Sequence, residues 1–376
     1  MPELDPVALE ILRSRLISIA DESAVALLRT SFSTIVRESN DYATVLMDEH
    51  GDSLAENTAG IPSFVGILPR TRKAMLARDP RETWRPGDCV ITNDPWLATG
   101  HLPDITMAAP IFHRGRLVGF SGSITHSPDI GGSLWAADCR ELYEEGLRIP
   151  PLRFLVEGTP NQDVVDMILG NVRVPEQVLG DLNAQVTAQR VCARRLGEFL
   201  DDAGMVDLTE LLCALQERAE AAMRTAIEAV PDGNHRGTVV ADGFDADPTR
   251  IECRMVVHGS TLHVDYAGTS RQIDRGLNSV MNYTYAVYPI KCALDPLTPR
   301  DEGSYRSVTV DAPLGSILNP RFPAPCNARQ LTGHLLAGAV YACLARAVPG
   351  RIIADCGGAP SFRSPEAAKR DYGVDV

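Results

Sequence analysis

The stretch that decides the fold covers residues 101–126 and has the sequence HLPDITMAAPIFHRGRLVGFSGSITH. It contains two runs of β-forming residues, 105–110 and 117–124, separated by the turn-forming segment His-Arg-Gly-Arg. Pro103 disfavours a helix ahead of the first run. The pattern therefore predicts an antiparallel hairpin, with His101 and Asp104 before its first strand and His126 after its second.

Outward from this hairpin, helical and strand-like segments alternate in blocks. The Asp-Pro pair at residues 5 and 6 is typical of a helix start, because aspartate caps the first turn and proline needs no N–H partner there. The apolar spacing predicts helices over 7–30, 65–76, 162–230 with breaks at Pro175 and Gly204, 278–294 and 332–347, and further strands over 89–92, 237–240, 251–257 and 262–266.

Strands clustered between helical blocks, without a βαβ repeat, indicate a mixed α+β fold in which helical blocks flank antiparallel or mixed sheets. The length of 376 residues favours more than one unit. We expect an N-terminal unit over 1–160 that carries the hairpin, a helical region over 161–232 and a C-terminal α+β region over 233–376.

The composition excludes several classes of protein. The net charge is −13 and no basic block offsets it, so neither nucleic acid nor an anionic membrane is an expected partner. The longest apolar run, 335–345, is too short to span a bilayer, and the N-terminus lacks the pattern of a signal peptide. The nine cysteines are scattered and form no CxxC pair. We therefore expect a soluble, cytoplasmic protein.

Several catalytic and nucleotide-binding motifs are absent from the sequence. It has no GxxxxGK[ST] phosphate loop, no GxGxxG, no HExxH and no GxSxG. The segment Gly131-Gly132-Ser133 faintly resembles the loop of a serine amidase, but no lysine is placed to act as its base. A Walker-type ATP site within this chain is thus excluded.

The hairpin carries a constellation that could bind a metal. Pairing of its strands would bring His126 beside Asp104, and the turn at Pro103 could aim His101 at the same point. Two histidines and one carboxylate leave coordination positions for water, as catalytic metal sites do, and they suit zinc, manganese and iron alike. The alternative is that these are ordinary polar residues, since an HxxD pair is common by chance.

Two neighbouring acids, Asp94 and Asp129, are candidates to orient the imidazoles from outside the ligand shell. The remaining histidines have no partner at ligand spacing and favour surface or structural roles. They include His50, His113, His235, His258 and His263.

Longer motifs in a fixed order make the chain resemble the hydantoinase B/oxoprolinase family. The resemblance extends from about residue 5 to at least 347. It rests on Asn93-Asp94-Pro95, Gly100-His101-Leu102-Pro103-Asp104, His126-Ser127-Pro128-Asp129-Ile130-Gly131-Gly132, Tyr143-Glu144-Glu145-Gly146-Leu147-Arg148-Ile149-Pro150, Asn171-Val172-Arg173 and Gly180-Asp181-Leu182-Asn183-Ala184-Gln185.

This resemblance implies a two-component, ATP-dependent enzyme that opens hydantoin, 5-oxoproline or lactam rings. It implies that ATP is bound by a hydantoinase A-type partner subunit, in a hetero-oligomer of the A2B2 kind. It also implies one divalent metal held by His101, Asp104 and His126, which would lower the pKa of a water molecule that attacks the phosphorylated substrate.

Three further residues of these motifs are candidate catalytic residues. Glu144 or Glu145 could transfer protons, and Arg148 could hold phosphate or a substrate carboxylate. The alternative for all three is a solvated loop with local ion pairs.

The chain also departs from the family pattern. Leu97-Ala98-Thr99-Gly100 stands where relatives commonly have Gly-Gly-Thr, so the identity of the substrate does not follow from the resemblance. The chain ends soon after Asp355-Cys356-Gly357-Gly358, and we expect its C-terminal region to be reduced or truncated. Two other functions stay open: a subunit of an ATP-dependent ketone carboxylase, and a non-catalytic subunit that supports its partner.

Overall fold

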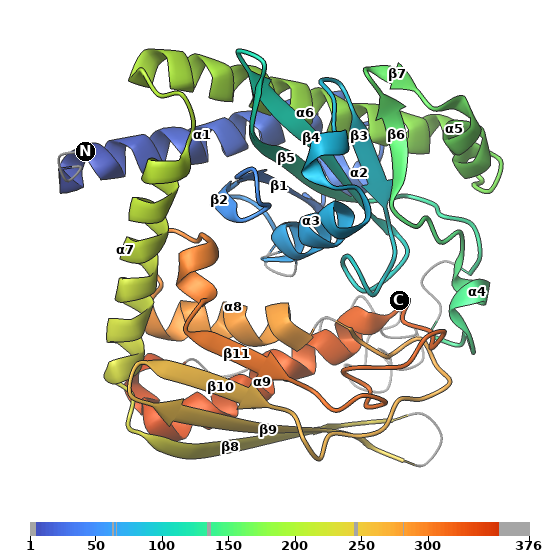
Figure 1. The fold of residues 1–376 in the computed structure, drawn as a ribbon. Helices are drawn as coiled ribbons and strands as arrows, with labels where there is room; N and C mark the ends of the chain where they lie inside the picture. The colour runs from blue at the N-terminus through green and yellow to red at the C-terminus, as the bar shows by residue number, and fades with distance from the viewer. Residues whose placement is uncertain are drawn as a thin grey trace.

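The structure is a computed structural model that describes residues 5–61, 64, 66–133, 137–243, 247–280 and 282–352. The segment at 355–358, on which the expected C-terminal reduction depends, lies outside the described residues. The predicted mixed α+β class is confirmed, with helices packed on two sheets (Figure 1).

The larger sheet has seven strands in the order β2-β1-β5-β4-β3-β6-β7. Every neighbouring pair in it is antiparallel. The strands are β1 (Tyr42–Met47), β2 (Ser53–Glu56), β3 (Cys89–Thr92), β4 (Asp104–His113), β5 (Arg116–His126), β6 (Leu152–Val156) and β7 (Thr159–Pro160).

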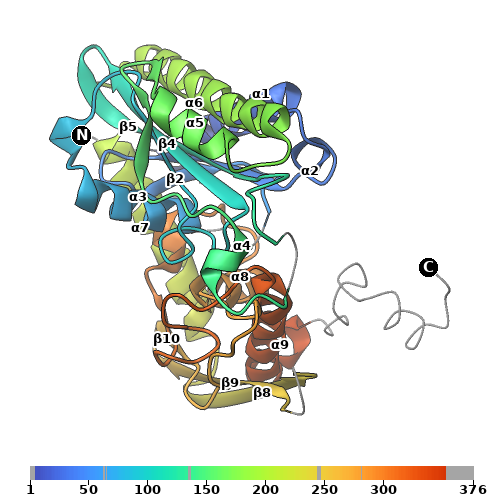
Figure 2. The ribbon, with the colours of Figure 1, turned by 90° about the vertical axis from the view of Figure 1, so that its right-hand side faces the viewer.

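Helices cover both faces of this sheet, with α1 (Pro6–Thr30) and α6 (Pro175–Ala203) on one face and α3 (Ile67–Arg78) on the other (Figures 1 and 2). Successive side chains of a strand point to opposite faces. Accordingly, Leu46 of β1 packs with α1 and α6, whereas its neighbour Met47 packs with α3. Burial on both faces explains why β1 lacks the polar–apolar alternation of an ordinary surface strand.

The smaller sheet has the order β11-β10-β9-β8, and only its β10–β11 pair is parallel. Helices α8 (Asn282–Leu294) and α9 (Arg329–Ala347) lie on one face of it, between the two sheets (Figure 1). Burial alternates along β9, as expected for a strand with one face in the core. The strands are β8 (Gly233–Ala241), β9 (Thr249–His258), β10 (Thr261–Asp265) and β11 (Val308–Asp311).

The helical region 161–232 adds its buried residues to the cores on either side. Helix α6 packs into the core of the larger sheet through Leu196 and Phe199. Helix α7 (Thr209–Glu228) contributes Leu215 to that core and Met223 to the core of the smaller sheet. It thereby joins the two halves. The remaining short helices are α2 (Thr34–Arg37), α4 (Leu142–Glu145), α5 (Gln162–Leu169), η2 (Arg81–Thr83), η3 (Glu302–Tyr305) and η4 (Pro349–Arg351).

Helix α8 begins later than the sequence predicts. The pattern predicts a helix from residue 278, but α8 begins at Asn282. The reason is Asn278, whose side-chain amide donates to the carbonyl oxygens of Ile273, Arg275 and Pro325. Side-chain bonds of this kind compete with helix formation.

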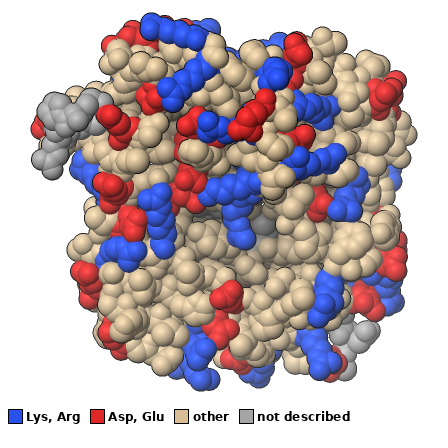
Figure 3. All heavy atoms as spheres, viewed as in Figure 1, with Lys and Arg blue, Asp and Glu red and all other residues tan. Residues whose placement is uncertain are grey.

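Charged side chains of both signs are mixed over the face drawn in Figure 3, without a large area of one sign. Among the helices of the described residues, none combines the length and the apolar character that crossing a membrane requires.

Candidate metal centre

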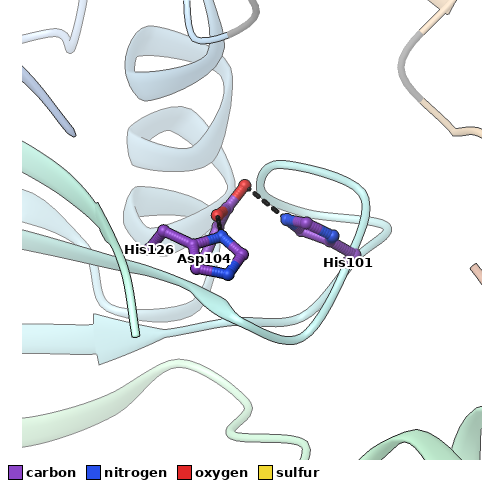
Figure 4. Close-up of side chains that lie close together, drawn as sticks. All are labelled: His101, Asp104 and His126. Carbon is purple, nitrogen blue, oxygen red and sulfur yellow. Dashed lines mark hydrogen bonds and ion pairs between the residues drawn. The ribbon is translucent and has the colours of Figure 1, made fainter. Parts of the chain in front are cut away.

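The predicted hairpin exists, and its register positions two of the three predicted ligands. Asp104 begins β4, His126 ends β5, and the two residues are direct partners in the ladder. His101 lies in the turn that leads into β4, and its side chain approaches the Asp104 carboxylate (Figure 4). The sequence prediction that the open end of the hairpin joins Asp104 and His126 is thus confirmed.

The three side chains converge on one point. His101 Nε2 lies 2.8 Å from Asp104 Oδ2, and His126 Nδ1 lies 2.8 Å from Asp104 Oδ1. One candidate ligand atom from each residue lies within 4.8 Å of the others. All three residues are buried. This spacing matches three donors that share one ion, for which bond lengths are about 2.0–2.2 Å.

The protonation of His101 fits a cation between it and Asp104. Its Nδ1 lies 3.1 Å from the carbonyl oxygen of Asn327, which can only accept, so Nδ1 carries the proton. Burial lowers the pKa of His101, which favours the neutral ring. Nε2 lies 2.8 Å from Asp104 Oδ2, where a protonated ring forms an ion pair with the carboxylate. In the neutral ring, Nε2 carries the lone pair that a metal ion held between it and Asp104 would bind.

Asp104 is the centre of this cluster. Burial by itself would raise the pKa of its carboxyl, but the imidazoles of His101 and His126 hold it well below its ordinary value. Arg329 Nη2 also donates to Asp104 Oδ2 at 2.9 Å. The carboxylate therefore stays ionised, as a metal ligand must.

Sequence reasoning missed two residues beside the cluster. Asp41 Oδ2 lies 3.8 Å from His126 Nδ1, and burial together with Asp104 raises the pKa of Asp41 to about 6. Arg329 comes from the start of α9, 225 positions along the chain from Asp104. Asp41 directly precedes β1, and β1 pairs with β5, whose last residue is His126. A sequence prediction of β1 would therefore have indicated that Asp41 lies near His126.

A cavity of about 450 Å³ opens on the cluster, between the larger sheet and the helices α8 and α9. That volume lies in the range of small-molecule sites. Besides the three predicted ligands, its described lining consists of Asp41, Ile61, Phe64, Thr284, Tyr285, Tyr288, Pro289, Arg329, Gln330, His334, Ala337 and Tyr341.

The three predicted catalytic residues are absent from the described lining of this cavity. Glu144 is exposed at the surface. Arg148 pairs with Asp94 instead, with its Nε 3.0 Å from Asp94 Oδ2. Glu145 is buried, and its Oε1 accepts from the backbone N–H groups of Cys326 and Asn327, both at 2.7 Å. These positions do not support direct catalysis by any of the three.

The structure shows which groups bond Asp94 and Asp129, the two acids expected to support the imidazoles. Asp94 bonds Arg148, and Asp129 accepts from Arg173 Nη1 at 2.8 Å. Each carboxylate is thus paired with a guanidinium, and its support of an imidazole stays a prediction. The group that bonds the outer nitrogen of His101 and orients its ring is the Asn327 carbonyl. Glu145 in turn accepts from the Asn327 N–H.

We expect Glu145 to make stability depend on pH. Burial raises the pKa of its carboxyl from 4.5 to about 7. Below pH 4.5 both folded and unfolded chains carry the proton, but between pH 4.5 and 7 only the folded chain keeps it. The free energy of unfolding should therefore fall as pH rises through this window, by up to about 3 kcal/mol from this group. Glu145→Gln should flatten that part of the profile in denaturant titrations, and an unchanged slope would contradict the assignment.

Comparison with known proteins decides the family. The model of the hydantoinase B/oxoprolinase family matches residues 5–366, nearly the whole chain. The chain belongs to this family.

Two bacterial relatives in this family are each 32% identical to the chain. One, from Pseudomonas sp. (strain NS671), is assigned as the B-type subunit of a D-/L-hydantoinase, and the other is the beta subunit of the caprolactamase of Pseudomonas jessenii. The matches cover 95% of this chain but only 64% and 62% of those proteins. The chain thus spans less than two thirds of their length. A 5-oxoprolinase of Dictyostelium discoideum is 26% identical over 85% of the chain, which corresponds to 26% of that protein.

Two solved structures share the fold. The ATP-dependent caprolactamase of Pseudomonas jessenii superposes with a TM-score of 0.85 at 30% identity, over 92% of this chain and 61% of that one. An acetone carboxylase superposes with a TM-score of 0.79 at 20% identity, over 92% of this chain and 48% of that one. At that identity the second likeness concerns the fold alone.

Proposed function

We propose that this hydantoinase B-family chain is the metal-bearing subunit of a two-component, ATP-dependent cyclic amidohydrolase. Its substrate would be a hydantoin, 5-oxoproline or lactam ring. The observation that carries the proposal is the buried cluster of His101, Asp104 and His126 at a cavity of small-molecule size. The relatives named as hydantoinase and caprolactamase subunits supply the reaction class.

The division of labour between subunits follows from two observations. The sequence has no Walker-type phosphate loop, and both bacterial relatives are named as single subunits of a larger enzyme. ATP would be bound by a hydantoinase A-type partner, in an A2B2 assembly. Phosphorylation of the amide oxygen there would make the ring carbon more electrophilic. Addition of water to that carbon and cleavage of the C–N bond would open the ring to an amine and an acyl phosphate, and a second water would then release phosphate and leave the carboxylate. The activated ring would then react in the cavity of this chain.

In this chain, His101, Asp104 and His126 would hold the divalent ion. Bound there, zinc, manganese or iron would supply Lewis acidity and lower the pKa of a water molecule. The Asn327 carbonyl keeps the His101 proton on Nδ1, which leaves the lone pair of Nε2 to bind the ion. Asp41, whose pKa is raised to about 6, lies where it could accept a proton from that water. The cavity walls would exclude bulk water from the activated ring.

The purified chain is expected to contain about one divalent ion. Elemental analysis of the chain co-purified with its partner measures this directly. Removing the ion with a chelator should abolish substrate-dependent ATP hydrolysis, and adding zinc, manganese or iron should restore it for one of the three. A metal-free chain with full turnover would leave only a supporting role for this subunit.

The reaction class is tested on the same complex. ATP hydrolysis is measured with hydantoins, 5-oxoproline, lactams and ketones, each with and without bicarbonate. A ring-opened product from a cyclic amide is the expected result. A carboxylated product from a ketone, formed only with bicarbonate, would instead identify a carboxylase subunit.

A further inference from the structure

The part of the cavity wall that α9 supplies carries an exposed imidazole, that of His334. Gln330, His334, Ala337 and Tyr341 follow one another at intervals of four, three and four residues, so they share one face of the helix. Unlike the buried Arg329 at the start of α9, His334 has no hydrogen-bond or ion-pair partner among the residues that the structure describes. Its ring nitrogens are therefore open to a ligand in the cavity.

The position of His334 relative to the metal cluster is set by α9. Arg329 Nη2 bonds Asp104 Oδ2 at 2.9 Å, which fixes the start of the helix beside the cluster. His334 is five residues further on, which is about 7.5 Å along the helix axis. Helix α8 holds α9 in this place, because the Tyr285 ring packs so closely on Gly333 that a Cβ there would lie 2.3 Å from Tyr285 Cζ. A small ligand bound at the cluster would thus have His334 nearby.

The charges of the cavity suit an anionic ligand once the proposed divalent ion is bound. Among the described lining residues, Asp41 and Asp104 are the acids and Arg329 is paired with Asp104. With the ion added, the positive charges exceed the negative ones. The His334 ring donates an N–H whether it is neutral or charged. A phosphoryl group is the matching ligand, because it is anionic and offers three strong acceptor oxygens.

We propose that His334 donates a hydrogen bond to the phosphoryl group of the activated ring and holds that group in the cavity. The proposal rests on the proposed function and adds to it a residue that binds the activated part of the substrate. The hydrogen bond is charge-assisted, since the phosphoryl oxygen is an anion. The aromatic side chains of Tyr285 and Tyr288 on α8 border the same cavity and can pack against the hydrocarbon part of the ring.

Holding the phosphoryl group would keep the use of ATP coupled to ring opening. A phosphorylated amide that escapes into bulk water can react at phosphorus instead of at the ring carbon. Water then breaks the P–O bond and gives back the intact amide together with phosphate. ATP is consumed in that case although no ring is opened. Loss of His334 should therefore waste ATP as well as weaken the binding of phosphate.

Phosphate binding tests His334 without the partner subunit and without turnover. Inorganic phosphate and methyl phosphate are titrated by calorimetry into the full chain with its metal. His334→Leu removes both ring nitrogens and should weaken binding about tenfold to hundredfold. His334→Arg supplies a cation with several N–H donors and should bind phosphate at least as tightly as the unmodified chain. Both variants should keep their metal, because His334 is not one of the proposed ligands.

His258→Leu is the matched control for His334→Leu. His258 is exposed at the end of β9, and it does not line the cavity. This variant should bind phosphate like the unmodified chain. Equal phosphate affinity in the two leucine variants would overturn the proposal.

The complex with the partner distinguishes the phosphoryl group of the ring from free phosphate. ATP hydrolysed and ring opened are measured in the same reaction with a lactam or a hydantoin. In His334→Leu the ratio of ATP hydrolysed to ring opened should rise, and His334→Arg should bring it back. Weaker phosphate binding with an unchanged ratio would mean that His334 binds free phosphate alone, and would overturn its assignment to the activated ring.

Failure of the proposed function gives a different result. The unmodified complex, with its metal in place, would then show no ATP hydrolysis that depends on a cyclic amide. That result would overturn both the amidohydrolase and the assignment of His334 to a phosphorylated ring. The calorimetric comparison of His334→Leu with His258→Leu would still decide whether His334 binds phosphate.

Discussion

Replacing Asp104 with asparagine is expected to empty the metal centre and abolish ATP-coupled ring opening. One Asp104 oxygen contacts His126, and the other contacts His101 and Arg329. Asparagine keeps the shape but lacks the charge that the ion and the guanidinium require. The loss of metal affinity should exceed the roughly 10–100-fold that follows when a group supporting a ligand is removed.

The same substitution should also destabilise the chain. It leaves the buried guanidinium of Arg329 without its carboxylate, and breaking a buried pair in this way costs about 3–5 kcal/mol. Elemental analysis and thermal melting of the purified variant measure the two effects.

Asp88→Asn is the matched control for Asp104→Asn. Asp88 is also buried and also paired with an arginine, Arg153, but it does not line the cavity. This variant should lose stability while keeping about one ion per chain. If Asp104→Asn also keeps its ion, Asp104 is not a ligand and the proposed centre is wrong.

Glu145→Ala is expected to weaken metal binding from outside the cavity. Glu145 Oε1 accepts from the N–H groups of Cys326 and Asn327, and the Asn327 carbonyl faces His101 Nδ1. Alanine leaves two buried N–H groups unpaired, at about 1–3 kcal/mol each. It also releases the carbonyl that fixes the His101 ring, and we expect about a tenfold to hundredfold loss of metal affinity.

Two variants separate this positioning role from proton transfer. Glu145→Gln keeps an oxygen that can accept both N–H groups, so it should retain metal and turnover, whereas a proton-transferring glutamate would not tolerate the change. Glu144→Ala alters the exposed neighbour in α4 and should behave like the unmodified chain. Competition with a chromogenic chelator gives the affinities. Equal metal affinity in Glu145→Ala and the unmodified chain would disprove the positioning role.

Much of the fold is predictable because its signals are local. The β4–β5 hairpin is indicated by two β-forming runs and a turn, and β3 (Cys89–Thr92) has the bounds that the sequence predicts. Helix α1 begins where Asp5 and Pro6 indicate, and Asp5 Oδ2 accepts from the N–H of Ala8. Strands such as β1 are missed because burial on both faces removes the alternation that marks a strand.

The position of the candidate metal ligands could be inferred for the same reason, since Asp104 and His126 are neighbours in one hairpin. The roles of Glu145 and Arg148 could not. The local sequence around a carboxylate gives no indication of whether it faces a cavity or a backbone N–H 182 positions away. Only packing decided that Glu145 supports the Asn327 segment and that Arg148 pairs with Asp94.

The sequence by itself determined the hairpin at 101–126 and the three side chains at its open end, because turn residues and runs of β-forming residues act over a few positions. The tertiary structure alone decided what surrounds them. Helices α8 and α9 bring Tyr285, Arg329 and Gln330 to the cluster from distant parts of the chain, with Arg329 lying 225 positions from Asp104. Such contacts form when apolar faces from distant segments are buried together, and no local pattern encodes which faces will meet.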